Sequence, residues 1–338
     1  MSQRINQDFI DQFNQKFTET IALKYRRIHA DNCHHWDYTF LPWHRKFVTQ
    51  FWTELDLPRT YAVLTEDADR QLYASLVKSV LPAGNGFQFV DDRNKLNSFT
   101  TDDLAQMKVN IAEGMACKSF ALDLDLEGSN RFGGLYNLSF SSQIQEFHDI
   151  IHGETGASMR SLQTAGGDQC FFMHHTFVDL IFETWLNDNP ELGMPVPREN
   201  FEASPDLQQD YDSYEELESL FSARYFAEED YKIIRRIIAP LTRFAVFFDR
   251  IEHSEGYRRV IMYYNSREIG RFAILTGQEE TCVGCARRQA HTGQFLIQEL
   301  VPVTEISWNI DNQWFTDFQS AVQKFSEIGM SAPRVVSF

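Results

Sequence analysis

Eight of the ten histidines of this chain fall in two short windows, residues 29–44 and 148–175. His148 and His152 are four residues apart, so on a helix their imidazoles lie on one face, one turn apart. A helix holds two nitrogen ligands on one metal ion in this way. His175 can supply a third nitrogen from a second helix. Two clusters of three histidines are what a pair of adjacent metal ions would need.

Apolar periodicity predicts that the segments carrying these histidines are helical. Phe9, Phe13, Phe17 and Ile21 recur at every fourth position, which predicts an amphipathic helix over residues 6–29. Pro42 suits the first turn of a helix that runs to about Asp56. Further helices are expected at residues 65–80, 101–115, 140–152 and 172–187, with a loop rich in Gly, Ser and Thr at 153–170.

The pattern changes in the last third of the chain. Residues 188–212 contain several prolines and predict a surface linker, and residues 213–239 are charged and helical. Segments rich in Val, Ile, Phe and Tyr predict strands at residues 243–249, 258–265, 269–276 and 294–303, followed by one helix near 314–328. The expected fold is therefore mainly α, with a helical domain at 1–212 and a smaller β-rich domain at 213–338.

Composition excludes several classes of function. The formal net charge of −17 argues against sequence-independent binding of nucleic acid, because such binding needs basic patches that contact the phosphates. The chain has neither the apolar core of a signal peptide nor an apolar run of membrane-spanning length, which predicts a cytoplasmic protein without membrane partners. The five cysteines do not suggest a disulfide framework. Oligomeric state is not predicted.

The number and type of ligands favour copper. Imidazole suits copper, zinc, iron and nickel. A di-iron bundle would require inward-facing glutamates in Glu-x-x-His spacing, and a single catalytic zinc would leave one histidine cluster unexplained. Two all-imidazole sites therefore favour a dicopper centre. His174 and His175 are about 100° apart on a helix, so we expect His175 to be the ligand and His174 to lie behind it.

Two motifs resemble those of a known family. The first places His35 before Phe40-Leu41-Pro42-Trp43-His44-Arg45. The second comprises His148, His152, Gly153, Gly156, Met159, Asp168, Phe171, His174, His175 and Asp179. Over residues 20–187 the chain resembles the type 3 copper proteins, namely tyrosinases, catechol oxidases and molluscan hemocyanins, and most closely tyrosinase. Gln169 stands where that family usually has proline after the aspartate.

The resemblance implies a ligand set for two copper ions. The first ion would be held by His29, His35 and His44, and the second by His148, His152 and His175. Only five residues separate His29 from His35, where the family usually has a longer spacing, and His34 is the alternative first ligand.

The resemblance also implies supporting residues. Cys33 would form a thioether with His35, or remain a free thiol. Asp149 or Glu146 would take the proton of a phenol, with a solvent-facing carboxylate as the alternative for Glu146. Arg45 and Asp179 would pair between the two metal helices. Cys282 and Cys285 would deliver copper, or form a disulfide, a shared metal site or a plain turn.

The implied activity is the oxidation of phenols or catechols to o-quinones with dioxygen. The chain would be a tyrosinase or a polyphenol oxidase of the catechol oxidase type. The alternative is a hemocyanin-like dioxygen carrier whose C-terminal domain shields the site. The sequence leaves open whether monophenols or diphenols, free or in peptides, are the substrates.

Overall fold

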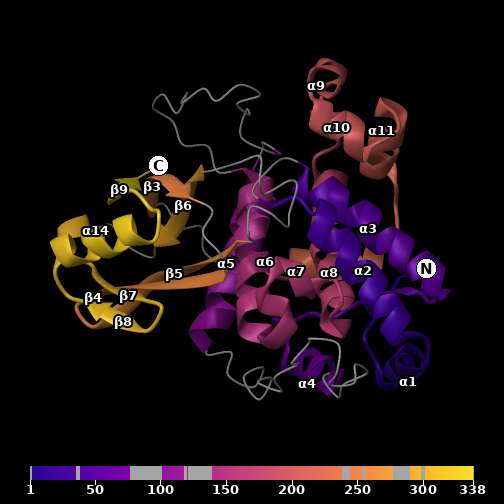
Figure 1. The fold of residues 1–338 in the computed structure, drawn as a ribbon, viewed down its shortest axis with the longest axis horizontal. Helices are drawn as coiled ribbons and strands as arrows, with labels where there is room; N and C mark the ends of the chain where they lie inside the picture. Colours follow the sequence, from indigo (N-terminus) through magenta and orange to yellow (C-terminus); the bar gives the residue numbers. More distant parts are fainter. Residues whose placement is uncertain are drawn as a thin grey trace.

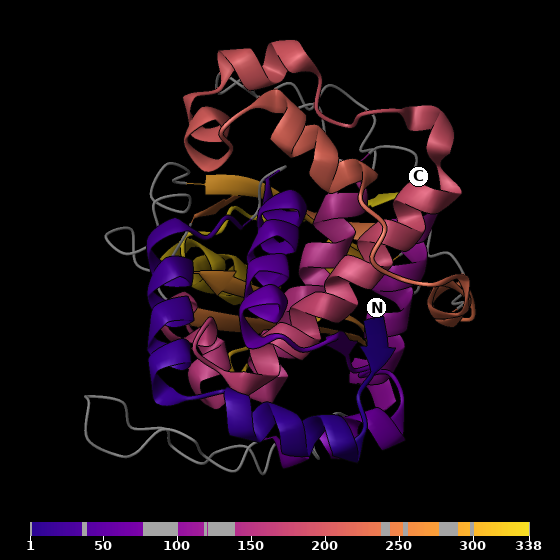
Figure 2. The same ribbon diagram turned by 90° about the vertical axis from the view of Figure 1, so that its right-hand side faces the viewer.

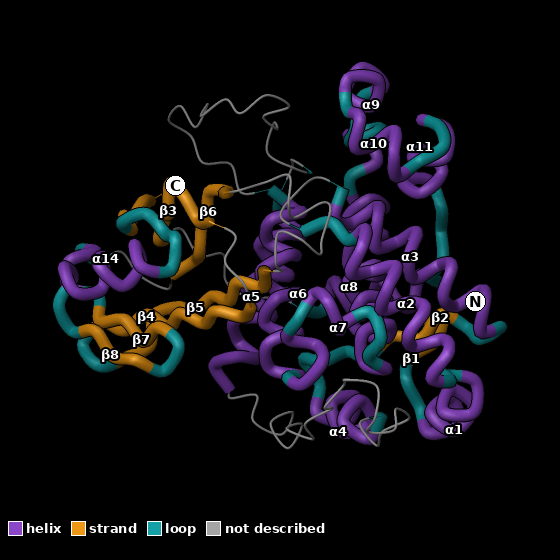
Figure 3. The backbone as a smooth tube through the Cα atoms, viewed as in Figure 1, coloured by secondary structure: helices purple, strands orange, loops and turns teal. Residues whose placement is uncertain are grey.

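The computed structural model describes residues 2–35, 39–76, 101–117, 120, 139–237, 244–252, 256–276, 290–297 and 301–337. A helical body occupies one side of the molecule and a β-rich part the other (Figure 1). In the tube view the strands after residue 243 gather at one end, and a short strand pair lies in the helical body near the N-terminus (Figure 3). The expected mainly α fold with a smaller β-rich C-terminal region is confirmed.

Several helices of the helical body lie side by side, and α1 Gln7–Lys16 crosses one end of them (Figure 2). The other helices of the first half are α2 Glu19–Asn32, α3 Phe40–Leu55, α4 Asp67–Ser75, α5 Thr101–Ala116, α6 Phe140–Thr155 and α8 Gln169–Asp188. Between or after them come η2 Ala157–Arg160, α7 Leu162–Ala165, η3 Pro190–Leu192, α9 Arg198–Ala203, α10 Pro205–Asp210, α11 Tyr214–Ser222 and α12 Glu228–Arg235. The strands β1 Ser2–Arg4 and β2 Arg59–Tyr61 pair in parallel.

The helix predicted over residues 6–29 is two helices, and that prediction was wrong. The Thr18 side chain accepts a hydrogen bond from the Ile21 amide and so starts α2, after α1 has ended at Lys16. The apolar repeat nevertheless continues across the break. Phe9, Phe13 and Phe17 stack in series, with ring centroids 5.4 and 5.1 Å apart. Burial of one continuous aromatic face explains why periodicity alone did not reveal the break.

Two segments expected to be irregular contain short helices. The predicted loop at residues 153–170 includes η2 and α7, and the predicted linker at 188–212 includes η3, α9 and α10. Ser161 and Ser204 cap α7 and α10 by accepting backbone amides. Helices of one or two turns give too short a repeat for periodicity to detect.

The β-rich part consists of two antiparallel sheets with strand orders β6-β3-β9 and β5-β4-β7-β8. The strands are β3 Phe244–Glu252, β4 Gly256–Tyr264, β5 Arg267–Thr276, β6 Ala290–Ile297, β7 Ser307–Ile310, β8 Gln313–Phe315 and β9 Pro333–Ser337, with η4 Val303–Glu305 and α14 Phe318–Glu327. The four predicted strands and the late helix are present, whereas β7, β8 and β9 were missed. Asn265 and Ser266 both have positive φ, as a tight turn between β4 and β5 requires.

Packing favours a domain boundary later than residue 212. The buried side chains of α11 and α12, such as Leu217 and Ile234, belong to the core of the helical body. A second core begins at Val246 within the β-rich part. The helical residues after 212 therefore pack with the metal-site helices, although the division into two domains stays a prediction.

The two parts meet where β5 lies against α6 (Figure 1). Arg271 on β5 and Arg259 on β4 both pair with the buried carboxylate of Asp103 on α5. Arg259 also pairs with Glu154 on α6 at 3.2 Å. The β-rich part thus contributes a partly buried arginine, Arg259, to the helix that carries His148 and His152, and a buried one, Arg271, to the neighbouring α5. Among the helices in the described ranges, none combines the length and apolarity needed to cross a bilayer.

Candidate metal centre

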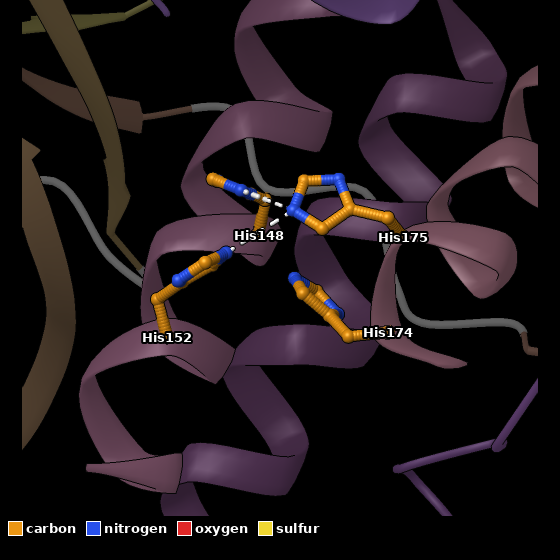
Figure 4. A group of neighbouring side chains, drawn as sticks. All are labelled: His148, His152, His174 and His175. Carbon is orange, nitrogen blue, oxygen red and sulfur yellow. Dashed lines mark hydrogen bonds between the residues drawn. The ribbon is translucent and has the colours of Figure 1, made fainter. Parts of the chain in front are cut away.

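Four histidines form one group between α6 and α8. His148 and His152 lie one turn apart on α6, as their spacing predicted, and His174 and His175 come from α8 (Figure 4). The Nε2 atom of His175 lies 3.2 Å from the Nε2 atoms of both His148 and His152. Three ring nitrogens from two helices therefore converge on one point.

Hydrogen bonds at the far side of two of these rings fix their tautomers. The Nδ1 atom of His152 lies 2.7 Å from the Met159 carbonyl, and the Nδ1 atom of His148 lies 2.8 Å from Asp149 Oδ1. Carbonyl and carboxylate oxygens only accept, so each Nδ1 carries the hydrogen. In each of these neutral rings the Nε2 atom therefore carries a lone pair. Both Nε2 atoms face His175. A neutral His175 has only one hydrogen to donate, so it cannot satisfy both of the other nitrogens at once. A cation bound at this point would accept the lone pairs of all three nitrogens.

His174 lies closer to the group than expected. One nitrogen from each of the four histidines lies within 4.8 Å of those of the others. The His174 ring stacks near that of His148, with centroids 5.2 Å apart. The expected 100° applies to the directions in which the side chains leave α8, but the imidazole is long enough to return toward α6. His174 therefore shares the group, and the choice of His175 as the ligand stays a prediction.

Three histidines form a second group between α2 and α3, with His35 on the segment that joins them. Nitrogens of His29, His35 and His44 all lie within 4.8 Å of one another. The Nδ1 atoms of His29 and His44 each lie 2.8 Å from a carbonyl, that of Leu162 and that of Phe40. The same reasoning leaves Nε2 of both rings as a lone pair. Among the described residues, neither ring nitrogen of His35 has a hydrogen-bond partner.

His34 does not join this group. Its Nε2 atom lies 2.7 Å from a carboxylate oxygen of Asp210 on α10, with both side chains largely buried. The geometry therefore favours His29 over His34 as the companion of His35 and His44, despite the short spacing between His29 and His35.

The two groups share one interior. The His44 and His175 rings stack with centroids 4.4 Å apart, and the His35 and His148 rings lie 5.4 Å apart. Phe40 and Phe171 pack against histidines of both groups. The two windows of sequence thus converge in space, as the prediction of a dinuclear site requires.

Burial keeps these imidazoles neutral. Removal from water lowers the pKa of His44, His148, His152 and His175 well below the usual value, because the charged form loses its hydration, and the nearby rings add to the effect. Burial lowers the pKa of His174 to about 3. Neutral imidazole is the form that binds metal. The site is therefore held in the ligand form at neutral pH.

A buried ion-pair network joins the helices behind the histidines. Arg45, next to His44, pairs with Asp179 on α8 at 2.5 Å, as predicted, and with Glu183 at 3.2 Å. Glu183 also accepts from the Tyr231 hydroxyl and from the backbone amides of residues 225 and 226. The network fixes α3 against α8 and ties α12 to both. Sequence reasoning gave no role to Glu183, although its position four residues after Asp179 on one helix face was a usable signal.

The two candidate proton acceptors occupy different surroundings. Asp149 is buried and bonded to His148, so it orients that ring. Glu146 is buried too, and the alternative of a solvent-facing carboxylate was wrong. Burial raises the pKa of Glu146 well above its usual value, and the carboxylates of Asp149 and Glu113 add to the effect.

The structure does not test the roles predicted for Cys33, Cys282 and Cys285. Cys33 is buried at the end of α2 and is not in a disulfide. Its thioether to His35 stays a prediction. Cys282 and Cys285 lie outside the described residues.

Comparison with known proteins agrees with this geometry. A family model described as the common central domain of tyrosinase matches residues 82–188, which include the group between α6 and α8. A tyrosinase of Oryzias latipes is 38% identical over 53 residues, covering 16% of this chain and 10% of that protein. A tyrosinase of Neurospora crassa is 29% identical over 107 residues, covering 30% of this chain and 15% of that protein. The matches thus span only a small part of these relatives.

Solved structures share the fold over nearly the whole chain. A functional unit of octopus hemocyanin superposes with a TM-score of 0.56 at 15% identity, covering 98% of this chain and 96% of that one. A tyrosinase from Burkholderia thailandensis gives a TM-score of 0.52 at 12% identity, covering 97% of each. The matched central domain of tyrosinase at residues 82–188 and the shared fold together support the type 3 copper proteins, which include tyrosinases and hemocyanins, as the family that this chain resembles.

Proposed function

We propose that the two histidine groups each hold one copper ion, with His29, His35 and His44 at one and His148, His152 and His175 at the other. The observation that carries this proposal is that Nε2 of His148 and Nε2 of His152 each lie 3.2 Å from Nε2 of His175, with lone pairs on the first two because their Nδ1 atoms carry the hydrogens. Imidazole is a preferred ligand of copper. Bound copper would supply the electron exchange with dioxygen that no side chain in the site can provide.

The proposed reaction is the oxidation of a phenol or catechol to an o-quinone. Two catechols each lose two electrons and two protons, and together they reduce one dioxygen to two waters; a monophenol instead takes up one atom of dioxygen and the other atom leaves as water. The chain holds the imidazoles in one tautomer and excludes water through Phe40 and Phe171. Glu146 is our candidate acceptor for the substrate proton, because it is buried on α6 two residues before His148, and burial together with the Asp149 and Glu113 carboxylates raises its pKa. Asp149 is assigned to orienting His148.

Copper content and catechol turnover test the proposal together. We expect about two coppers per chain, one for each group, and quinone formation that depends on both dioxygen and copper. His175→Ala should lose about half of the copper and all turnover, since His175 contributes to the convergent point of one group. The matched control is His34→Ala, which should keep both coppers because His34 pairs with Asp210. A protein that binds zinc alone, or one copper, would contradict the proposal.

A second candidate is reversible dioxygen binding without turnover. It is supported by the likeness to the hemocyanin functional unit over nearly the whole chain. Addition of catechol to the copper-loaded, oxygenated protein separates the two functions. An enzyme forms quinone and consumes dioxygen continuously, whereas a carrier releases its dioxygen when the pressure is lowered and forms no quinone.

A further inference from the structure

The short segment between α6 and α8 contacts both histidine groups. We call residues 156–167, which contain η2 and α7, the strap. Its Met159 carbonyl accepts from Nδ1 of His152, and its Leu162 carbonyl accepts from Nδ1 of His29, at 2.7 and 2.8 Å. One histidine of each group is therefore oriented by carbonyls only three residues apart.

Internal hydrogen bonds make the strap a compact unit. The Thr164 hydroxyl donates to the Ser158 carbonyl at 2.7 Å, and the Ser158 hydroxyl donates to Asp168, the residue that caps α8. Arg160 donates to the Gly153 carbonyl at 2.8 Å and so fastens the strap to the end of α6. Met159 and Leu162 are buried. The two carbonyls therefore move together or not at all.

The strap docks on α2 through a pair of glycines. A Cβ atom at Gly166 would lie 2.5 Å from His29 Cβ and 2.9 Å from the Tyr25 carbonyl oxygen. One at Gly167 would lie 3.0 Å from the Ala22 carbonyl oxygen. The obstructing atoms are backbone carbonyl oxygens and the first carbon atoms of the His29 and Arg26 side chains, and none of these can turn aside as the far end of a flexible side chain would. Arg26 completes the contact by donating to the Gln163 carbonyl at 2.9 Å.

We propose that the strap couples the two metal sites, with Gly166 as a positioning residue for both. A side chain at Gly166 pushes the strap away from α2, so that the Leu162 carbonyl leaves His29. The same displacement shifts the Met159 carbonyl, which orients His152. The inference rests on the proposed binding of metal by the two groups. Its consequence is that one substitution on the α2 side weakens metal binding at the site between α6 and α8.

The test is titration of full-length metal-free protein with Cu(I) against a chromogenic chelator. Gly166→Ala should weaken the site that contains His29 by about 10- to 100-fold, as loss of a ligand's orienting partner usually does. In a His44→Ala background, which leaves one intact site, Gly166→Ala should still weaken the remaining site by several-fold. Gly193→Ala is the control for backbone strain: its φ of +65° makes alanine unfavourable there, but its Cβ would meet no atom within 4 Å, so stability should fall while copper affinity stays unchanged.

Thr164→Val keeps the proposal testable if Gly166→Ala does not fold. It removes only the hydroxyl that joins Thr164 to the Ser158 carbonyl within the strap, and it hardly changes the shape of the side chain. It should weaken both sites. Unchanged affinity at the remaining site in either variant would overturn the coupling, even if the melting temperature falls. Failure of the parent protein to bind copper would instead overturn the proposed function.

Discussion

The two histidine groups are built differently. The group on α6 and α8 takes all its members from two facing helices, and Nε2 of His175 lies 3.2 Å from Nε2 of both His148 and His152. The group on α2 and α3 takes His35 from the segment between helices, and two of its rings are oriented by main-chain carbonyls at Leu162 and Phe40. The first arrangement places its imidazoles through the packing of two helices, with the Met159 carbonyl orienting one ring, whereas the second also depends on how the segment that carries His35 docks. We therefore expect the α2–α3 group to release its ion more readily.

The largest expected effect comes from removing one ligand from each group. His148→Ala should abolish binding at the α6–α8 site, while the α2–α3 site remains. His35→Ala should do the reverse. Each variant should retain about half of the copper, and neither should turn over catechol, because both ions are required. Copper analysis of the purified variants checks this, and retention of both ions in either variant would refute the assignment.

A large loss of stability is expected when the network between the two groups is broken. Arg45→Met removes the ion-pair partner of the buried Glu183 and leaves Asp179 paired with Arg59 alone, and breaking a buried ion pair in this way typically costs about 3–5 kcal/mol of unfolding free energy. Arg235 pairs with Asp188 and Glu228 at the surface, and Arg235→Met should cost no more than about 1 kcal/mol. Denaturant unfolding of the metal-free proteins measures both. Equal losses would show that Arg45 does not fix α3 against α8.

An intermediate effect is expected at Asp149, which orients a ligand of the α6–α8 group only. Asp149→Leu removes the acceptor for the His148 N–H and should weaken copper binding at that site by about 10- to 100-fold. Asp149→Asn retains an acceptor oxygen and should restore much of the affinity. Copper titration separates the two variants. Similar affinities for both would mean that His148 needs no orienting partner.

The smallest expected effect is a change in pH dependence from one ring. The pKa of His174 is about 3 in the folded protein, against about 6.5 in an unfolded chain. The unfolded state then binds more protons below pH 6.5, so the ring's contribution to stability is present above that pH and is lost as the pH falls toward 3. In metal-free His174→Phe, the fall in unfolding free energy should be shallower by about 1 kcal/mol per pH unit in this range. An unchanged slope would mean that His174 is not held neutral by burial.

The contrast between the groups also explains what the sequence could predict. The spacing of His148 and His152 and the residues around His44 carry a side-chain signal, so both groups could be expected. Main-chain acceptors such as the Met159 and Leu162 carbonyls carry none, because every residue has a carbonyl. Their positions depend on the short helices of the strap, which periodicity cannot detect. The break at Thr18 was hidden for a related reason, since the apolar face continues across it.

The contact of Arg259 and Arg271 with Asp103 and Glu154 has a consequence for how the protein unfolds. Separation of the β-rich part would leave carboxylates that folding had removed from water without their counter-charges, which is costly. The two hydrophobic cores should therefore melt together, as one cooperative transition in calorimetry rather than two. Arg271→Met, which weakens this connection, should split that transition, with the β-rich part melting first.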